Sequence, residues 1–172
     1  MKAYTLLIIF GVVVTTHAQS QSGATAGESA DRIAIRELID AYGHDADHRE
    51  AEKQAALFTP DGELENIHTE PGRPGERTTL RGRKDLAAGF ATLKKFEVTM
   101  HFNGQCTINI NGDSATAETY CLAHHIWVDS GRRVLMIIGI RYEDTIVKIN
   151  GAWLFAKRQL YYLWIDRRPL NP

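Results

Sequence analysis

A carboxylate, an imidazole and a phenol occur in three separated stretches of this sequence, and together these groups can move a proton. Tyr42 is followed five residues later by Asp47, His101 lies in a Thr-Met-His-Phe segment, and His124 and His125 are adjacent. Such groups perform general acid–base catalysis at neutral pH in an apolar cavity without a metal or cofactor. We therefore take Tyr42, Asp47, His101 and His124 as candidate catalytic residues and expect no cofactor.

The carboxylate and the first histidine also have purely structural explanations. Asp47 is expected just past the end of the first helix, where it could cap the second helix instead. Asp45 is the competing carboxylate, and its position two residues earlier directs it elsewhere. His101 alternates with Met100 and Phe102, which places it on the opposite face of a strand from both. It could be a core or edge histidine that bonds to the backbone.

The doublet supplies at most one cavity histidine, because adjacent residues of a strand face opposite sides of the sheet. Which of the two faces inward stays open; we take His124 as catalytic and His125 as substrate-binding. Two cavity histidines with Asp47 could alternatively bind a divalent metal, but we expect no metal site. His44 and His48 straddle the predicted break between two helices, so they need not share a face.

Large apolar and aromatic residues are frequent near these positions. Most would be core residues in any fold, but together they are consistent with a cavity for a hydrophobic, ring-sized substrate. The sequence has no Walker loop, Rossmann fingerprint, G-x-S-x-G elbow or C-x-x-C pair, so nucleotide-dependent and acyl-enzyme mechanisms have no support. The candidate substrate-binding residues are Phe58, His125, Trp127, Met136, Ile138, Tyr162 and Trp164.

Residues 1–18 have the pattern of a secretory signal peptide. Lys2 precedes an apolar core at 6–14, and small residues precede Gln19. An uncleaved anchor is the alternative. Residues 19–28 are polar and small and are expected to form a disordered tether, and residues 29–168 are expected to form one domain. We expect export, to the periplasm or outside the cell, and no membrane association after cleavage.

The charge balance limits the possible partners. The chain has 20 Lys+Arg against 21 Asp+Glu, and loss of Lys2 leaves a net charge of about −2, which argues against nucleic-acid binding. The 44% hydrophobic content is enough for a real core. Cys106 and Cys121 flank a predicted hairpin, and a disulfide and two buried free thiols both remain open. Neither cysteine has the spacing of a zinc site.

The order of the elements indicates an α+β fold, with helices first and long strands afterwards. The first helix begins near Ser29 or Asp31 and has Gly43 in its last turn. Turn sequences at 111–113, 129–131 and 150–151 join four β segments into an antiparallel meander. A curved sheet over the helices would leave a pocket between the layers. The other predicted segments are helices at about 48–58 and 84–95, a turn at 59–62, a strand at 63–68, a mobile loop at 69–78, and strands at 98–110, 115–128, 133–148 and 153–165.

Four stretches resemble SnoaL-like proteins of the nuclear-transport-factor-2-like superfamily. They are residues 34–42, residues 56–62, residues 117–125, and the segment from 141–144 to 150–153. The similarity covers about residues 30–166. It implies a cone-like α+β barrel in which three N-terminal helices close a curved antiparallel sheet around a deep pocket.

Three enzyme groups of this superfamily share residues with the chain. Tyr42, Asp47 and His101 resemble the Tyr/Asp/His set of bile acid 7α-dehydratase, and Asp47 with His101 resembles the dyad of hexachlorocyclohexane dehydrochlorinase. His101 and His124 resemble the two histidines of scytalone dehydratase. All three groups eliminate HX from a ring without a cofactor. The chain departs from them at Met136 and Ile138, where scytalone dehydratase has polar residues, and it lacks a matching arginine.

The resemblance and the residues together favour a cofactor-independent lyase for a small hydrophobic cyclic substrate, with His101 as base and Asp47 as its partner. An isomerase or cyclase with a similar substrate is one alternative, because it starts with the same proton abstraction. A non-catalytic exported protein that binds a hydrophobic small molecule is another. The resemblance also leads us to expect a homodimer or homotrimer.

Overall fold

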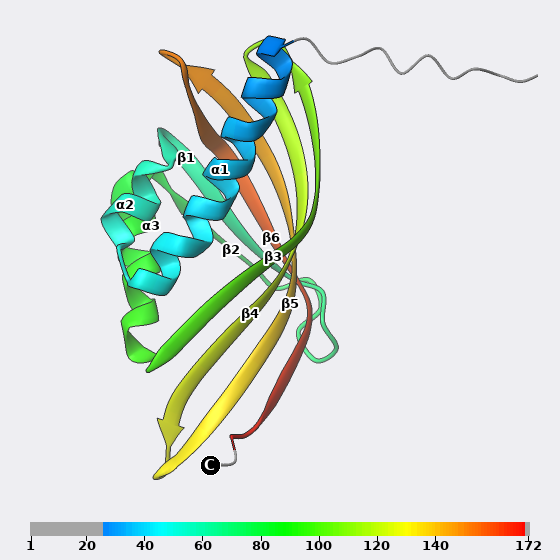
Figure 1. The fold of residues 1–172 in the computed structure, drawn as a ribbon. Coiled ribbons are helices and arrows are strands. Elements are labelled where there is room, and N and C mark those ends of the chain that lie inside the picture. The colour runs from blue at the N-terminus through cyan, green and yellow to red at the C-terminus, as the bar shows by residue number, and fades with distance from the viewer. Residues whose placement is uncertain (1–25, 171–172) are drawn as a thin grey trace, which may run out of the picture.

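The computed structural model describes residues 26–170 as a strongly curved β-sheet with helices on its concave side (Figure 1). The predicted signal peptide and most of the predicted tether lie outside the described residues. Residues 26–28, which we expected in the tether, belong to the first helix. No helix between residues 26 and 170 is both long and apolar enough to cross a membrane.

Helix α1 (Ala26–His48) is longer than the sequence predicted, because it continues past Gly43. Asp47 therefore lies in the last turn of α1 and not in the link that follows. Gly43 is needed for close packing, since a Cβ atom there would lie 3.2 Å from the Cβ atom of His101. The helix buries the predicted stripe of Ile35, Leu38, Ile39 and Tyr42.

The end of α1 is a Schellman motif without the usual glycine. Arg49 has a positive φ of 60°, its N–H donates to the Ala46 carbonyl, and the Glu50 N–H donates to the Asp45 carbonyl. Helix α2 (Ala51–Ala56) follows at once, and Glu50 is its N-cap residue without a side-chain cap bond. The alternative explanation, in which Asp47 caps the second helix, is therefore wrong.

The region after α2 differs from the prediction in two ways. Residues 59–62 are not a free turn but part of a strand, with a register shift between Phe58 and Glu63. Gly62 allows this irregularity, because a Cβ atom there would lie 2.9 Å from the Phe58 Cβ atom. The predicted loop is shorter because a second strand follows it. The elements are β1 (Phe58–His68), β2 (Arg77–Arg81), α3 (Gly82–Phe90) and a 3₁₀ turn (Ala91–Lys95).

The four long strands and their hairpins agree with the sequence prediction. Ser130 with Gly131, and Asn150 with Gly151, have positive φ, as two-residue hairpin turns require. The sheet has the order β2-β1-β6-β5-β4-β3, with β1 parallel to β6, and it stays open between its edge strands. The long strands are β3 (Val98–Asn111), β4 (Ser114–Asp129), β5 (Arg132–Ile149) and β6 (Ala152–Pro169).

The convex face of the sheet carries exposed apolar side chains, among them Met100, Phe102 and Trp164. The expected homodimer or homotrimer stays a prediction.

Cys106 and Cys121 are free thiols, and a bulge sets them opposite Thr119 and Asn103 instead of each other.

Candidate active site

The centre of the site is an ion-pair-type contact between Asp47 of α1 and His101 of β3. The His101 ring and the Asp47 carboxylate are joined by an Nδ1 to Oδ1 contact of 2.7 Å. The backbone N–H of His101 donates to the other carboxylate oxygen at 2.9 Å. The carboxylate is thus fixed at both oxygens, and it holds the proton of His101 on Nδ1. Nε2 is left as the nitrogen that can accept a proton.

The charge state of Asp47 follows from these bonds. Burial acts to raise the pKa of this carboxyl, but the hydrogen bonds from the ring and backbone of His101 outweigh burial. The pKa of Asp47 therefore lies below its ordinary value. An anionic Asp47 stabilises the imidazolium that forms when His101 takes a proton.

Arg49 fixes the corner where α1 meets β3. Its guanidinium donates to the Asp47 carbonyl, to Thr99 Oγ1 at 2.8 Å and to the Phe96 carbonyl at 3.2 Å. These bonds join the last turn of α1 to the start of β3, where Asp47 and His101 meet. Arg49 was not among the residues predicted from the sequence, because no local pattern marks it.

The structure places His125, and not His124, on the cavity side of β4. The His125 ring stacks on Phe96 with centroids 4.5 Å apart and meets the His101 ring edge-on at 5.7 Å. Its two nitrogens are buried without a hydrogen-bond partner among residues 26–170, so they are available to a ligand. His124 lies on the opposite face, opposite Met100 in the strand register, which gives it no geometry for catalysis in this cavity.

Burial determines the charge of His125. Burial, followed by the nearby His101 ring, lowers the pKa of His125 to about 4. The ring is neutral at pH 7 and can donate a hydrogen bond to a carbonyl or a leaving group without carrying charge. The two cavity histidines therefore differ, since only His101 has a carboxylate partner.

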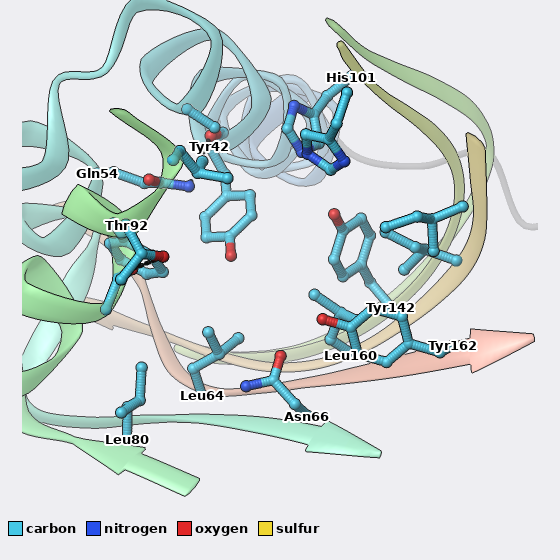
Figure 2. Close-up of a pocket in the computed structure, with 17 residues that line it drawn as sticks. Tyr42, Gln54, Leu64, Asn66, Leu80, Thr92, His101, Tyr142, Leu160 and Tyr162 are labelled. Atoms are coloured by element: carbon cyan, nitrogen blue, oxygen red, sulfur yellow. Dashed lines mark hydrogen bonds between the residues drawn. The ribbon is translucent and has the colours of Figure 1, made fainter. Parts of the chain in front are cut away.

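The cavity between the helices and the sheet has a volume of about 210 Å³ and is shown in Figure 2. Figure 2 shows the hydroxyls of Tyr42 and Tyr142 pointing into it. Burial raises the pKa of both phenols, so both remain hydrogen-bond donors. The lining residues are Tyr42, Ala46, Gln54, Leu64, Asn66, Leu80, Gly89, Phe90, Thr92, Leu93, His101, His125, Ile138, Ile140, Tyr142, Leu160 and Tyr162.

A buried ion pair, Arg158 with Asp144, packs against the rings of Tyr42 and Tyr142. The Arg158 guanidinium lies 4.3 Å from the ring centroids of both Tyr42 and Tyr142. It also forms two bonds to the Asp144 carboxylate, of 2.8 and 2.7 Å. Neither side chain of the pair is exposed to solvent. This ion pair holds the Tyr42 and Tyr142 rings in place and does not itself line the cavity.

The predicted substrate-binding residues divide into two groups. His125, Ile138 and Tyr162 line the cavity. The other four do not. Phe58 packs behind the Tyr42 ring, and Trp127 and Met136 line a separate hollow. Trp164 lies on the convex face over Gly139.

Sequence reasoning missed Tyr142, Asn66 and Arg49. Tyr142 could have been found from its spacing, because it follows Ile138 and Ile140 on the inner face of β5 at a period of two.

A family model for the SnoaL-like domain matches residues 27–159. The chain belongs to the SnoaL-like domain family. Relatives among curated proteins include uncharacterised proteins of Mycobacterium tuberculosis and Mycobacterium bovis, each 23% identical over 138 residues, or 80% of this chain and 89% of the relative.

Solved structures with the same fold include two proteins named for elimination reactions. A protein from Novosphingobium aromaticivorans with the provisional name scytalone dehydratase is 25% identical, with a TM-score of 0.69 over 84% of this chain and 93% of that chain. A type 2 hexachlorocyclohexane dehydrochlorinase is 20% identical, with a TM-score of 0.65 over 83% and 90%. The second likeness concerns the fold alone.

In this SnoaL-like domain, the cavity combines one carboxylate-linked histidine, one neutral histidine and three phenols. Such a set can remove a proton at Nε2 of His101 and hold an oxygen with neutral donors. Between residues 26 and 170, no three His, Cys, Asp or Glu side chains lie together in a way that could hold a metal ion.

Proposed function

We propose that the protein is a cofactor-independent lyase that eliminates HX from a small hydrophobic cyclic substrate. The observation that carries the proposal is the 2.7 Å contact between His101 Nδ1 and Asp47, with the His101 ring lining the cavity between the helices and the sheet. Asp47 itself stands behind the ring, in the position of a carboxylate that orients a base. A solvated His101, or an Asp47 used only as a helix cap, would have favoured a non-catalytic binding protein.

In the proposed reaction, Nε2 of His101 removes a proton from a ring carbon. The electrons of the C–H bond form a carbon–carbon double bond, and the bond to the neighbouring leaving group breaks. The leaving group departs as halide, or as hydroxide that gains a proton and becomes water. Tyr42 and neutral His125 can donate hydrogen bonds to a carbonyl or to the departing group, and so can Tyr142, whose side chain also has a hydrogen bond with Cys121.

The size and lining of the cavity support a small substrate. A volume of about 210 Å³ lies below that of typical sites for drug-sized ligands, which start at roughly 300 Å³. Eight lining side chains are wholly apolar, and five of the eight that carry a polar group are aromatic rings, so a ring with few polar groups fits better than a sugar. The similar structure named for a dehydratase supports elimination as the reaction class.

A substrate panel with matched histidine variants tests the proposal. Cyclic β-hydroxy ketones report dehydration through enone absorbance, and chlorinated cyclohexanes report dehydrohalogenation through chloride release. A general base contributes roughly 10²–10⁴-fold, so His101→Ala should lose at least about a hundredfold in turnover. His124→Ala is the control, because His124 lies on the other face of the same sheet. Equal turnover by wild type and a folded His101→Ala would refute the proposal.

The same panel separates elimination from the alternatives. In D₂O, an isomerase would return a rearranged product of unchanged mass apart from deuterium, and a binding protein would return the probe intact. Export is part of the proposal as well. N-terminal sequencing of the mature protein should start near Gln19.

A further inference from the structure

The cavity has a second polar side, away from His101. Figure 2 shows Asn66 and Tyr162 across the cavity from His101. Asn66 follows Leu64 on the inner face of β1, and Tyr162 follows Leu160 on the inner face of β6. Strands β1 and β6 are parallel neighbours, with Asn66 opposite Leu160 in the register, so Asn66 and Tyr162 are diagonal neighbours on one face. The proposed reaction uses neither residue.

The amide of Asn66 presents an acceptor to the cavity. Its Nδ2 atom donates to Thr78 Oγ1 on strand β2 at 3.2 Å. That bond uses the donor end of the amide and leaves Oδ1 as the acceptor. In Figure 2 this oxygen is directed toward the interior of the cavity.

Three residues that are close together in the sequence, His68, Thr69 and Glu70, hold Tyr162 in place. Its ring stacks on His68 with centroids 4.3 Å apart and an interplanar angle of 1°. His68 is fixed in turn by a 2.7 Å contact between its Nδ1 atom and Glu70. The backbone carbonyl of Tyr162 accepts bonds from the Thr69 N–H and hydroxyl.

The ionisation state of Tyr162 agrees with this role. Burial, and then the charge of Glu70, raise the pKa of the Tyr162 phenol above its ordinary value. The phenol therefore keeps its proton throughout the physiological range and donates a hydrogen bond instead of accepting one as a phenolate.

We propose that Asn66 and Tyr162 form a subsite for a hydroxyl group on the substrate ring, with His68 and Glu70 as positioning residues. A hydroxyl is both donor and acceptor, so it can donate to Asn66 Oδ1 and accept from the Tyr162 O–H at once. A ketone or halogen can use only the tyrosine. The subsite thus selects a cyclic alcohol or phenol whose hydroxyl lies away from the proton that His101 removes. This subsite deepens the proposed function and rests on it, because the bound ring is a substrate only if the protein is a lyase.

Binding of two naphthol probes tests the subsite without any turnover. Wild-type protein is titrated with 2-naphthol and with 2,6-dihydroxynaphthalene, and each Kd is measured by probe fluorescence. The second hydroxyl adds hydrogen bonds worth about 1.5 kcal/mol, so the dihydroxy probe should bind about tenfold tighter. Tyr162→Phe and Asn66→Leu should bring the Kd ratio close to one and leave the affinity for 2-naphthol within about threefold.

Tyr161→Phe is the matched control, because Tyr161 lies on the other face of β6 against Arg141. It should keep the tenfold ratio. If Asn66→Leu fails to fold, Asn66→Ser provides the second variant. Equal affinities for the two probes in wild type, no saturable binding of either, or a ratio that survives Tyr162→Phe and the Asn66 variant would overturn the subsite. Failure of the lyase proposal would instead appear as absent turnover with the probe preference intact.

Discussion

One histidine–carboxylate pair has its histidine on strand β3 and another has it at the end of strand β1, and their environments differ although their contacts are alike. His101 with Asp47 and His68 with Glu70 both have an Nδ1-to-oxygen distance of 2.7 Å. The first pair joins residues 54 positions apart on a helix and a strand, and its imidazole lines the cavity. The second joins residues two positions apart, and its imidazole is covered by Tyr162.

The difference shows that the contact alone does not define a catalytic base. Asp47 accepts at both oxygens from His101, whereas one buried oxygen of Glu70 has no hydrogen-bond partner among residues 26–170. The first pair uses Nδ1 of His101 for Asp47, so Nε2 is the nitrogen left for a ligand. The second presents the face of its ring to a phenol, and Tyr162, not His68, lines the cavity.

The largest expected effect separates the two carboxylates. Asp47→Asn should lower the turnover of a substrate that undergoes elimination about a thousandfold. An amide no longer fixes the tautomer of His101 or stabilises its imidazolium. Glu70→Gln, the same change in the other pair, should lower it less than about fivefold, since Glu70 touches only a positioning histidine. Steady-state kinetics of both variants measure this. Equal losses would remove the distinction between the pairs.

His125 extends the comparison to a cavity histidine without a carboxylate partner. Its folded pKa of about 4 lies below the unfolded value of about 6.5, so the unfolded state binds the proton first. Stability should therefore fall as the pH is lowered from about 6.5 to about 4, by up to about 3 kcal/mol from this residue.

Urea unfolding at several pH values checks this prediction. His125→Leu should flatten the pH dependence between about 6.5 and 4, and His124→Leu should not. A His125→Leu protein with the wild-type slope would show that the ring is not buried in its neutral form.

The contact between Asp47 and His101 should depend on Arg49, which joins the end of α1 to the start of β3. The pair of His68 and Glu70 needs no such residue, because its two members lie two positions apart. Arg49→Asn keeps a residue that tolerates positive φ but removes the guanidinium, so it should lower turnover about tenfold through a misplaced Asp47. The preference for the dihydroxy probe should be unchanged. Restored turnover in Arg49→Lys at wild-type level would indicate that a simple charge is sufficient there.

The smallest expected effect concerns the phenol beside the second pair. Glu70→Gln removes a negative charge that helps to raise the pKa of Tyr162, so this tyrosine should ionise at lower pH in the variant. Phenolate absorbance, taken as the difference from Tyr162→Phe, measures the shift. A Tyr162 that ionises at the same pH in both proteins would mean that Glu70 does not act on the phenol.

Much of the fold could be predicted from the sequence because its signals are local. Turns such as Asn150-Gly151 need positive φ at both positions, and this fixed the hairpins. The end of α1 was missed because Arg49 occupies the left-handed position where glycine is the usual signal. Strand β2 was missed because its pairing with β1 is not visible in its own short sequence.

The site residues could be predicted where side chains alternate regularly between the two faces of a strand. The prediction failed where a register shift breaks this alternation. Period-two spacing correctly placed His101 on the opposite face of β3 from Met100. Trp164 has the same parity as Tyr162, but a register shift in β6 pairs Tyr162 with Ile140 and Trp164 with Gly139, which turns the tryptophan outward. The meeting of Asp47 and His101 came from the family resemblance, since no spacing rule joins residues so far apart.

The most direct test of the central claim is proton abstraction itself, measured without a leaving group. NMR follows deuterium exchange from D₂O into the acidic ring position of 2-tetralone, with wild type, His101→Ala and His124→Ala. Catalysed exchange should persist in His124→Ala and fall at least about a hundredfold in His101→Ala. Exchange at the wild-type rate in a folded His101→Ala would contradict the assignment of His101 as the base.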